Sequence, residues 1–129
     1  MPLRKHEDIL VFSESKNGNY LYNPQMRKGI MRKKGRTVDS DVRVYGAYKS
    51  SVSVNDIYYP TSILEVGTVY RAKNVHPTQK PVALMEYLIK TYTNEGETVL
   101  DFTMGSGTTG VACKKLNRNF IGIELDKDY

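Results

Sequence analysis

The stretch Val99-Leu-Asp-Phe-Thr-Met-Gly-Ser-Gly-Thr-Thr-Gly110 decides the fold of this chain. Its pattern is typical of a buried strand that runs into a glycine turn and then into a helix. A second apolar run, Asn119-Phe-Ile-Gly-Ile-Glu-Leu125, follows and places an acid where a strand would end. This order of strand, turn, helix, strand and acid is how a doubly wound α/β sheet holds a nucleoside cofactor.

The spacing of the glycines indicates that the turn binds a ligand. Gly105, Gly107 and Gly110 fit G-x-G-x-x-G, and Glu124 lies 19 residues after the first of them. Glycine permits a sharp turn and lets a ligand approach the backbone without obstruction from a Cβ atom. A carboxylate at the end of the second strand can accept hydrogen bonds from both ribose hydroxyls. The alternative is a structural tight turn beside a surface glutamate, and the order of the neighbouring elements argues against it.

Regular elements are predicted on both sides of this turn. The apolar spacing i, i+3, i+4, i+7 predicts a helix over residues 77–93, with Pro81 in its first turn and Gly96 as its C′ residue. Strands are predicted over residues 98–101 and 119–124, and a helix over residues 108–116. The inward face of that helix is expected to carry Val111, Ala112 and Leu116, with Cys113 as a core residue rather than a nucleophile.

Composition limits the class of protein. At 129 residues the chain is one small domain or part of a larger one, and 40% hydrophobic and 26% charged residues are ordinary for a globular protein. The longest apolar run, residues 9–12, is too short to cross a bilayer, and no signal-peptide core follows Met1. A single cysteine excludes an internal disulfide, and His6 and His76 lack metal-ligand spacing. We therefore expect no membrane association, no metal and a cytoplasmic location.

Positive charge gathers in the first part of the chain. Residues 1–50 hold eleven Lys and Arg against five Asp and Glu, whereas residues 51–129 hold eight against nine. Seven of the ten tyrosines fall between residues 20 and 70, and cations interleaved with tyrosine suit phosphate contact and base stacking. A solvated basic loop is the alternative. The candidate DNA contacts are Arg27, Lys28, Arg32, Lys33, Lys34 and Arg36.

The rest of the first half shows little regular pattern. Residues 8–12 form a short β-rich run that predicts a strand buried on both faces. Between about residues 13 and 60, neither helical nor strand periodicity persists. Such a stretch is long for a structureless connection, so we expect it to be functional or partly mobile.

A further motif, His76-Pro-Thr-Gln-Lys-Pro81, precedes the predicted helix. Polar groups and a lysine at a helix start could hold the carboxylate of an amino-acid tail or a pyrophosphate, so chemistry alone leaves S-adenosylmethionine and a nicotinamide cofactor open. Taken with Asp101-Phe-Thr-Met-Gly-Ser-Gly-Thr-Thr109 and Phe120-Ile-Gly-Ile-Glu124, the motif resembles the β-group DNA amino-methyltransferases, the adenine-N6 and cytosine-N4 enzymes. Tyr59-Pro-Thr-Ser-Ile-Leu64 resembles a segment of their phage-type members, and residues 4–12 resemble the strand after their catalytic region.

The resemblance implies a Rossmann-like methyltransferase fold of the α/β class, incomplete here and carrying an irregular basic insertion. It implies S-adenosylmethionine as cofactor, with Thr78, Gln79 and Lys80 near its amino-acid tail and Glu124 on its ribose. It also implies three parts: a sheet strand in residues 1–16, a target-recognition region in 17–74 and a cofactor subdomain in 75–129. Many members read Asp-Pro-Phe, whereas Phe102 directly follows Asp101 here. The remaining implied cofactor residues are Asp101, Phe102, Gly105, Ser106, Gly107, Thr108 and Thr109.

One family motif is missing from these residues. The family holds a flipped base with an Asp/Asn-Pro-Pro-aromatic loop, and no two of the five prolines here are adjacent. We therefore assign no catalytic residue and expect a C-terminal piece of a DNA methyltransferase, inactive alone, whose missing N-terminal catalytic half is a possible partner.

The expected function is site-specific methylation of double-stranded DNA in a bacterial or phage-infected cell, as in restriction–modification, with adenine N6 favoured over cytosine N4. A second hypothesis is a non-catalytic remnant or split subunit that binds S-adenosylmethionine or DNA. A third is a nicotinamide-dependent oxidoreductase.

Overall fold

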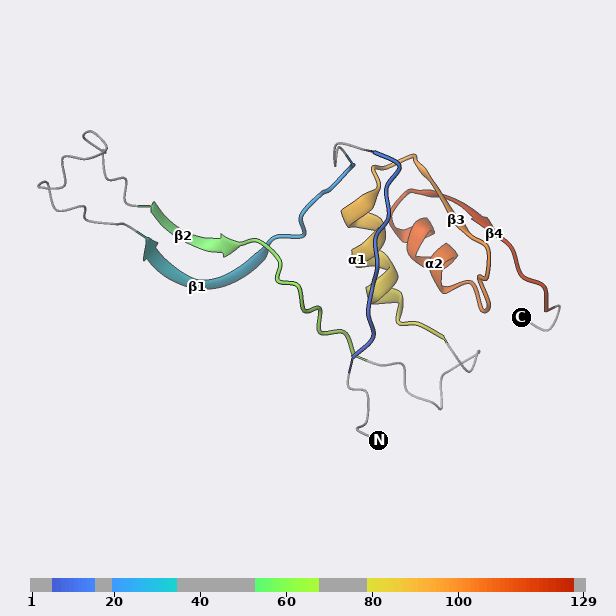
Figure 1. The fold of residues 1–129 in the computed structure, drawn as a ribbon, viewed down its shortest axis with the longest axis horizontal. Coiled ribbons are helices and arrows are strands. Elements are labelled where there is room, and N and C mark those ends of the chain that lie inside the picture. The colour runs from blue at the N-terminus through green and yellow to red at the C-terminus, as the bar shows by residue number, and fades with distance from the viewer. Residues whose placement is uncertain (1–5, 16–19, 35–52, 68–78, 127–129) are drawn as a thin grey trace, which may run out of the picture.

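The computed structural model describes residues 6–15, 20–34, 53–67 and 79–126. Two strands come first, β1 (Arg27–Lys34) and β2 (Ser53–Tyr58), followed by helix α1 (Val82–Tyr92). The chain then forms β3 (Thr98–Asp101), α2 (Thr108–Lys115) and β4 (Asn119–Gly122). Figure 1 shows the β1–β2 ribbon projecting from a body that holds the other four elements.

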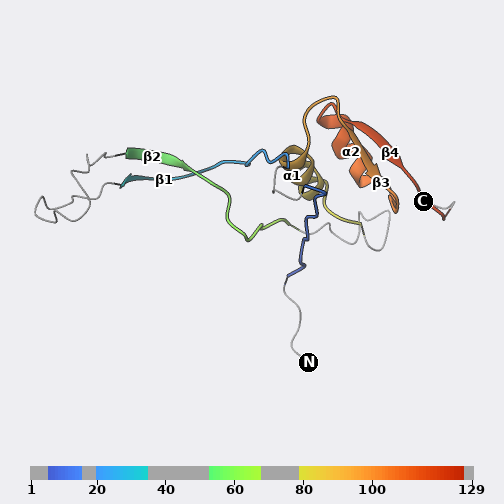
Figure 2. The same cartoon turned by 45° about the horizontal axis from the view of Figure 1, so that its top comes forward.

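The body is a parallel strand pair covered on one side by helices. β3 and β4 pair in parallel, with Val99 opposite Phe120 and Leu100 opposite Ile121. Figure 2 shows α1 and α2 together on one side of this sheet. The core between them holds three buried apolar residues among those described, Ile89, Ala112 and Cys113. Partly buried side chains surround them: Val82, Met85, Val99, Leu116 and Phe120.

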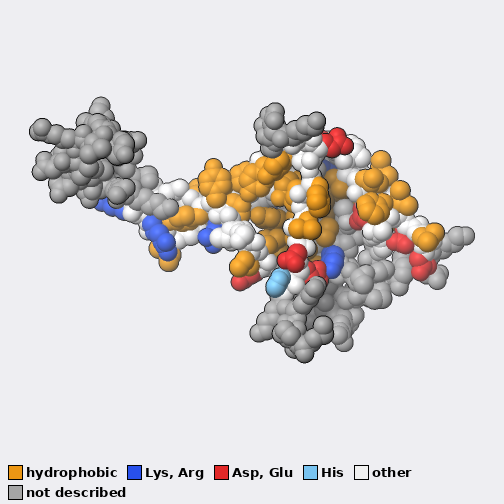
Figure 3. Space-filling model, in the orientation of Figure 1, with side chains coloured by type: hydrophobic (Ala, Val, Ile, Leu, Met, Phe, Trp, Pro, Cys, Tyr) orange, Lys and Arg blue, Asp and Glu red, His pale blue; other side chains and the backbone are white. Residues whose placement is uncertain are grey.

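The other face of the sheet is open among the described residues. Leu100 and Ile121, which are opposite each other in the register, are 57% and 53% exposed. Figure 3 shows hydrophobic atoms gathered on the surface of this part of the body. Parallel sheets are ordinarily covered on both faces, so the described part of the chain presents one half of such a layer arrangement.

Helix α1 is shorter than the sequence predicts. It begins at Val82 and ends at Tyr92, with Pro81 in an extended conformation (φ −62°, ψ 136°) at the N-cap instead of inside the first turn. Residues 77 and 78 of the predicted helix lie outside the described residues. The prediction for Gly96 is also wrong, because Thr93 is the C-cap. Gly96, at φ 80°, instead turns the chain toward β3 and donates its N–H to Asn117 O at 2.8 Å.

Helix α2 keeps the predicted place with one correction to its inner face. Ala112 and Cys113 are completely buried, as expected for core residues, and Leu116 packs against them. Val111 is 48% exposed, so its predicted inward orientation is wrong. The buried stripe follows the i, i+4 spacing of Thr108 and Ala112, and Val111 lies off that stripe.

The predicted strand over residues 8–12 is not observed. This stretch has no regular secondary structure, and Phe12 is 87% exposed. It runs in front of α1 in Figure 1, with no described strand beside it to form a ladder. β4 also ends at Gly122, short of the predicted residue 124. Backbone bonding nevertheless continues one residue further, because Ile123 donates its N–H to Asp101 O at 2.9 Å.

The insertion predicted to be irregular contains an antiparallel ribbon. Arg27 pairs with Tyr58 and Lys33 with Val54. The sequence did not predict these strands, because β1 is mostly basic and exposed on both faces and so lacks the alternation of apolar and polar residues that marks a strand. None of the helices in the described ranges is long and apolar enough to span a membrane.

Candidate cofactor site in the glycine loop

The loop between β3 and α2 depends on two glycines in left-handed conformations. Gly105 has φ 50°, and Gly107, at the N-cap of α2, has φ 73°. A residue with a Cβ atom is strained at such angles, so glycine is required for this path. A Cβ added at Gly107 would meet nothing within 4 Å. The space above the loop is therefore open at the point where a ligand would approach the backbone.

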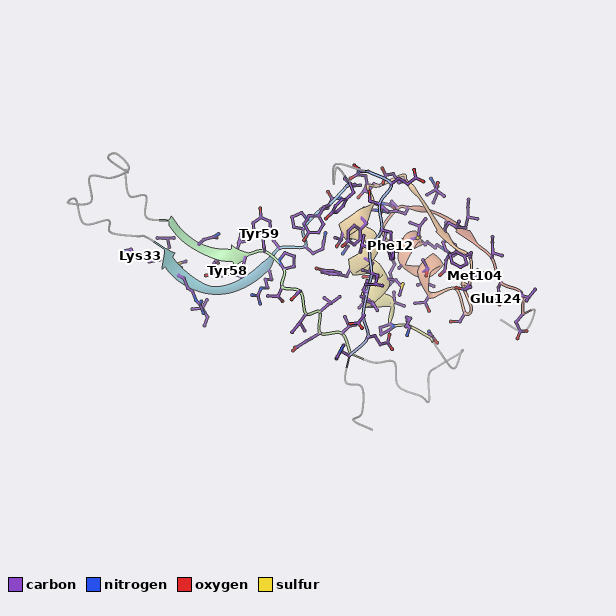
Figure 4. The ribbon with its side chains drawn as sticks, in the orientation of Figure 1. Phe12, Lys33, Tyr58, Tyr59, Met104 and Glu124 are labelled. Carbon is purple, nitrogen blue, oxygen red and sulfur yellow. The ribbon has the colours of Figure 1, made fainter. Side chains whose placement is uncertain are left out.

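Glu124 joins this loop to the end of the second strand. Its Oε2 accepts the Gly105 N–H at 2.7 Å across 19 residues of sequence. Its Oε1 accepts the N–H groups of Leu125 at 2.9 Å and Asp126 at 3.0 Å. Figure 4 shows Met104, beside Gly105 in the chain, and Glu124 close together at the end of the sheet. The carboxylate is thus held at the mouth of the loop by charge-assisted hydrogen bonds.

Asp101 forms a second anchor, at the end of β3. Its Oδ2 accepts the Thr109 hydroxyl at 2.6 Å, and its Oδ1 accepts the Thr103 N–H at 3.1 Å. One half-buried carboxylate therefore connects the strand, the loop and the first turn of α2. The turn closes through Gly107 N to Met104 O at 2.9 Å, and Thr108 is 8% exposed.

Gly110 and Gly122 let the helix approach the strand closely. A Cβ on Gly110 would lie 2.8 Å from Phe120 Cδ1 and Cε1. A Cβ on Gly122 would lie 2.8 Å from Phe120 Cε1 and would overlap the Met104 sulfur. These roles match the third glycine of a dinucleotide-type fingerprint, which permits close helix–strand packing.

Met104 is a site residue that sequence reasoning missed. It is half-buried, its sulfur packs over Gly122, and its N–H donates to Ile123 O at 3.1 Å. It thus fixes the loop against β4. The only sequence signal was its place directly before Gly105, inside the glycine motif.

The structure brings together most of the predicted cofactor residues. Asp101, Gly105, Gly107, Thr109 and Glu124 share the bonded network above, with Ser106 and Thr108 in the same turn. Phe102 begins the loop but is 72% exposed, with its ring turned to solvent.

The other predicted tail contacts lie before α1. The start of α1 and the glycine loop lie toward the same end of the body in Figures 1 and 2. Gln79 is half-buried there, while Lys80 forms an ion pair with Glu7 at 2.8 Å. Thr78 and His76 lie outside the described residues. In this arrangement an amino-acid tail would compete with Glu7 for the Lys80 ammonium.

Two other observations bear on the chemistry of the body. Burial raises the pKa of the Cys113 thiol, which keeps it protonated and agrees with a core role. Within residues 6–15, 20–34, 53–67 and 79–126, no three His, Cys, Asp or Glu side chains cluster closely enough to hold a metal ion.

The predicted DNA contacts lie away from the loop, on the ribbon. Arg27, Lys28, Arg32 and Lys33 are exposed along β1, and Figure 4 shows Lys33 toward the far end of the ribbon. Lys34 ends the strand, and Arg36 lies outside the described residues. Among the described ion pairs, only one involves these cations. It is a long contact of 3.9 Å between Lys28 Nζ and Asp56 Oδ2.

Comparison with known proteins identifies the family. The family model described as DNA methylase, N6_N4_Mtase, matches residues 2–129. The chain belongs to this DNA methylase family. The match confirms the resemblance drawn from the three sequence motifs and the Rossmann-like methyltransferase fold class of the α/β type.

Curated relatives agree with the family match. The Type II methyltransferase M.HpaI of Haemophilus parainfluenzae is 36% identical over 128 residues, which are 97% of this chain and 36% of that protein. The Type II methyltransferase M2.DpnII of Streptococcus pneumoniae is 56% identical over 54 residues, 42% of this chain and 20% of that protein. The chain therefore spans about a third of the length of M.HpaI.

A solved structure is also similar in part. The crystal structure of the M1.HpyAVI–SAM complex is 30% identical to this chain. The match covers 81% of this chain and 59% of that one, with a TM-score of 0.46.

The Asp101 anchor generates a stability prediction. Thr109→Val keeps the shape of the side chain but removes the hydroxyl that bonds Asp101, leaving a half-buried carboxylate oxygen without this donor. We expect a loss of about 1–3 kcal/mol in the free energy of unfolding, measured by urea denaturation of the 129-residue chain. Thr109→Ser, which keeps the donor, is the matched control and should lie near wild type. Equal stability of the Val and Ser variants would contradict the anchoring role.

Proposed function

We propose that this chain provides the S-adenosylmethionine-binding and DNA-contacting parts of a site-specific DNA amino-methyltransferase. The observation that carries the proposal is the bond from Gly105 N–H to Glu124, which puts a carboxylate at the mouth of an open glycine loop, where it could accept hydrogen bonds from a ribose. The family match to a DNA methylase supports the reaction class. Adenine N6 is our favoured target and cytosine N4 the alternative.

The cofactor, when bound, supplies an electrophilic methyl group on a sulfonium. The chain's residues would hold the rest of that molecule. The open space at Gly107 would let the cofactor approach the backbone, and Glu124 would accept hydrogen bonds from its ribose hydroxyls. A ribose hydroxyl would have to share or replace the Gly105 N–H on Glu124 Oε2, so binding should rearrange this bond. Asp101 and Thr109 keep the loop in place while this happens.

Methyl transfer needs a second group of residues. An exocyclic amine is a weak nucleophile because its lone pair is delocalised into the ring, so it must be held and aligned with the methyl carbon. The Asp/Asn-Pro-Pro-aromatic loop that does this in the family is absent from the 129 residues. We propose that a separate polypeptide segment supplies it, and the open sheet face around Leu100 and Ile121 is the surface it would cover.

DNA contact is assigned to the ribbon. Its exposed cations, Arg27, Lys28, Arg32 and Lys33, suit the phosphate backbone, which dominates the affinity of proteins for DNA. Figure 3 shows Lys and Arg atoms along the described part of the ribbon. In this assignment the ribbon holds the duplex while the glycine loop holds the methyl donor.

Cofactor binding is the direct test of the glycine loop. We expect calorimetric titration of the 129-residue chain to show binding of S-adenosylmethionine and none of NAD. Glu124→Ala should weaken that binding by at least about tenfold, which corresponds to about 1.4 kcal/mol for the lost ribose bonds. Glu95→Ala removes an exposed carboxylate elsewhere and is the matched control. Binding of NAD instead, or equal affinity of the two variants, would contradict the assignment.

Activity separates the enzyme from the non-catalytic alternative. We expect the 129-residue chain alone to transfer no tritiated methyl group to double-stranded DNA, because the base-holding loop is absent. A polypeptide carrying Asp-Pro-Pro-Tyr, encoded beside this chain, should restore transfer if the chain is a split subunit. Mass spectrometry of the product would then distinguish N6-methyladenine from N4-methylcytosine. Transfer by the chain alone would overturn the assignment of catalysis to another segment.

A further inference from the structure

The β1–β2 ribbon contains an irregularity at a defined place. Lys28 pairs with Ile57 and Arg32 pairs with Asn55, so the register shifts between these two pairs. Residues 29–31 therefore lie opposite Asp56 alone. A bulge of this kind bends a strand and re-aims the side chains that it carries, and such bulges occur beside functional sites.

Tyr58 holds the bulge in one conformation. Its hydroxyl lies 2.8 Å from Ile30 O and 3.1 Å from Asn55 O, so its proton is shared between the bulge and β2. Its ring lies against Gly29, where an added Cβ would be 3.0 Å from ring atoms Cδ2 and Cε2. Figure 4 shows Tyr58 on the part of the ribbon nearer the body. The bulge is therefore fixed by a side-chain hydrogen bond and by close ring packing.

The bulge presents two large apolar side chains to solvent. Ile30 is 78% exposed and Met31 is 67% exposed. Exposed cations flank them on both sides: Arg27, Lys28, Arg32 and Lys33. An apolar pair set within a row of cations is complementary to the major groove of DNA. In the major groove of DNA, thymine C5-methyl groups lie between two rows of phosphates.

The dimensions of the ribbon favour that groove. Paired strands lie about 4.8 Å apart before side chains are added. The major groove, about 12 Å wide, admits a two-stranded ribbon, whereas the minor groove, about 6 Å wide, takes one only when the duplex is bent or widened. The projection of the ribbon from the body in Figure 1 leaves it accessible along its length.

We propose that this ribbon enters the major groove and that Ile30 and Met31 contact thymine methyl groups there. The flanking cations contact phosphates and set the register, while Tyr58 acts as a positioning residue through the bulge. This inference rests on the proposed function, because it takes double-stranded DNA as the partner. It makes residues 30 and 31 specificity determinants, distinct from the cations that supply affinity.

The test compares thymine with deoxyuridine, which differs only by the C5-methyl group. Duplexes that the 129-residue chain retains would be selected from a random library and resynthesised with deoxyuridine in place of thymine. We expect wild-type affinity to fall by about fourfold for each contacted methyl, the fold-change for burying one methyl-sized group. The double variant Ile30→Ala with Met31→Ala should bind both duplexes equally. Tyr58→Phe, which loses the hydroxyl, should show a reduced difference between the two duplexes.

Lys33→Ala is the matched control, because it removes a phosphate contact and no apolar one. It should weaken binding to both duplexes alike and lower the salt slope by about 1. Equal wild-type affinity for the two duplexes would overturn the inference and leave the proposed function intact. If the Ile30→Ala, Met31→Ala double variant still bound the thymine duplex more tightly than the deoxyuridine duplex, the inference would also be overturned and the proposed function left intact. Absence of any duplex binding would instead contradict the proposed DNA contact itself.

Discussion

The hydrogen bond from Gly105 N–H to Glu124 Oε2, 2.7 Å long, is the interaction on which the site depends. It can form only if β3 and β4 run parallel and in register, so that both ends reach the same edge of the sheet. The bond lies at the point where the backbone enters its left-handed turn at Gly105, so it anchors the loop there. This one hydrogen bond therefore depends on both the local backbone geometry of the loop and the topology of the sheet.

Close packing beneath the loop keeps this contact in place. Phe120 fills the space that Cβ atoms on Gly110 and Gly122 would occupy, and the Met104 sulfur covers Gly122. The Asp101–Thr109 bond closes the other side of the turn. The described core is small, with three buried apolar residues, so the loop relies on these glycines and polar anchors more than on a deep hydrophobic interior.

The proposed function assigns two kinds of recognition to different parts of the molecule. In it, the body offers carboxylates and open backbone to a small cationic nucleoside, while the ribbon offers cations and an apolar bulge to a long anionic duplex. The two surfaces lie on different parts of the chain, as Figure 1 shows. The open sheet face at Leu100 and Ile121 adds a third surface, suited to the protein layer that a parallel sheet ordinarily requires.

The cofactor half of the fold could be predicted from sequence because its signals are local. Glycines at 105, 107 and 110 and an acid at 124 encode a turn and a strand end directly, and the structure adds a hydrogen bond between Gly105 and Glu124 that the sequence did not predict. The ribbon could not be predicted, because β1 is mostly basic and exposed and lacks hydrophobic alternation. The strand over residues 8–12 failed for the opposite reason. Its residues favour a strand, but none of the described segments pairs with it.

Helix α1 shows that the sequence pattern predicts a helix but not the residues at which it begins and ends. The apolar spacing of Met85 and Ile89 located the helix, yet Pro81 adopts ψ 136° and delays its start to Val82. The role of Met104 was likewise invisible, because its packing over Gly122 is a contact between two strand ends. Sequence thus located the glycine loop and the acid after the second strand, and tertiary contacts decided which neighbours support them.

The central claim is that the glycine loop and Glu124 together bind S-adenosylmethionine. The most direct measurement is an amide nitrogen–proton NMR titration of the 129-residue chain with that molecule. We expect the amide signals of Gly105 and Gly107 to shift, together with that of Leu125, whose N–H donates to Glu124, while the signal of Gly29 on the ribbon stays unchanged. A titration that leaves the loop signals in place, or that shifts only signals of the ribbon, would contradict it.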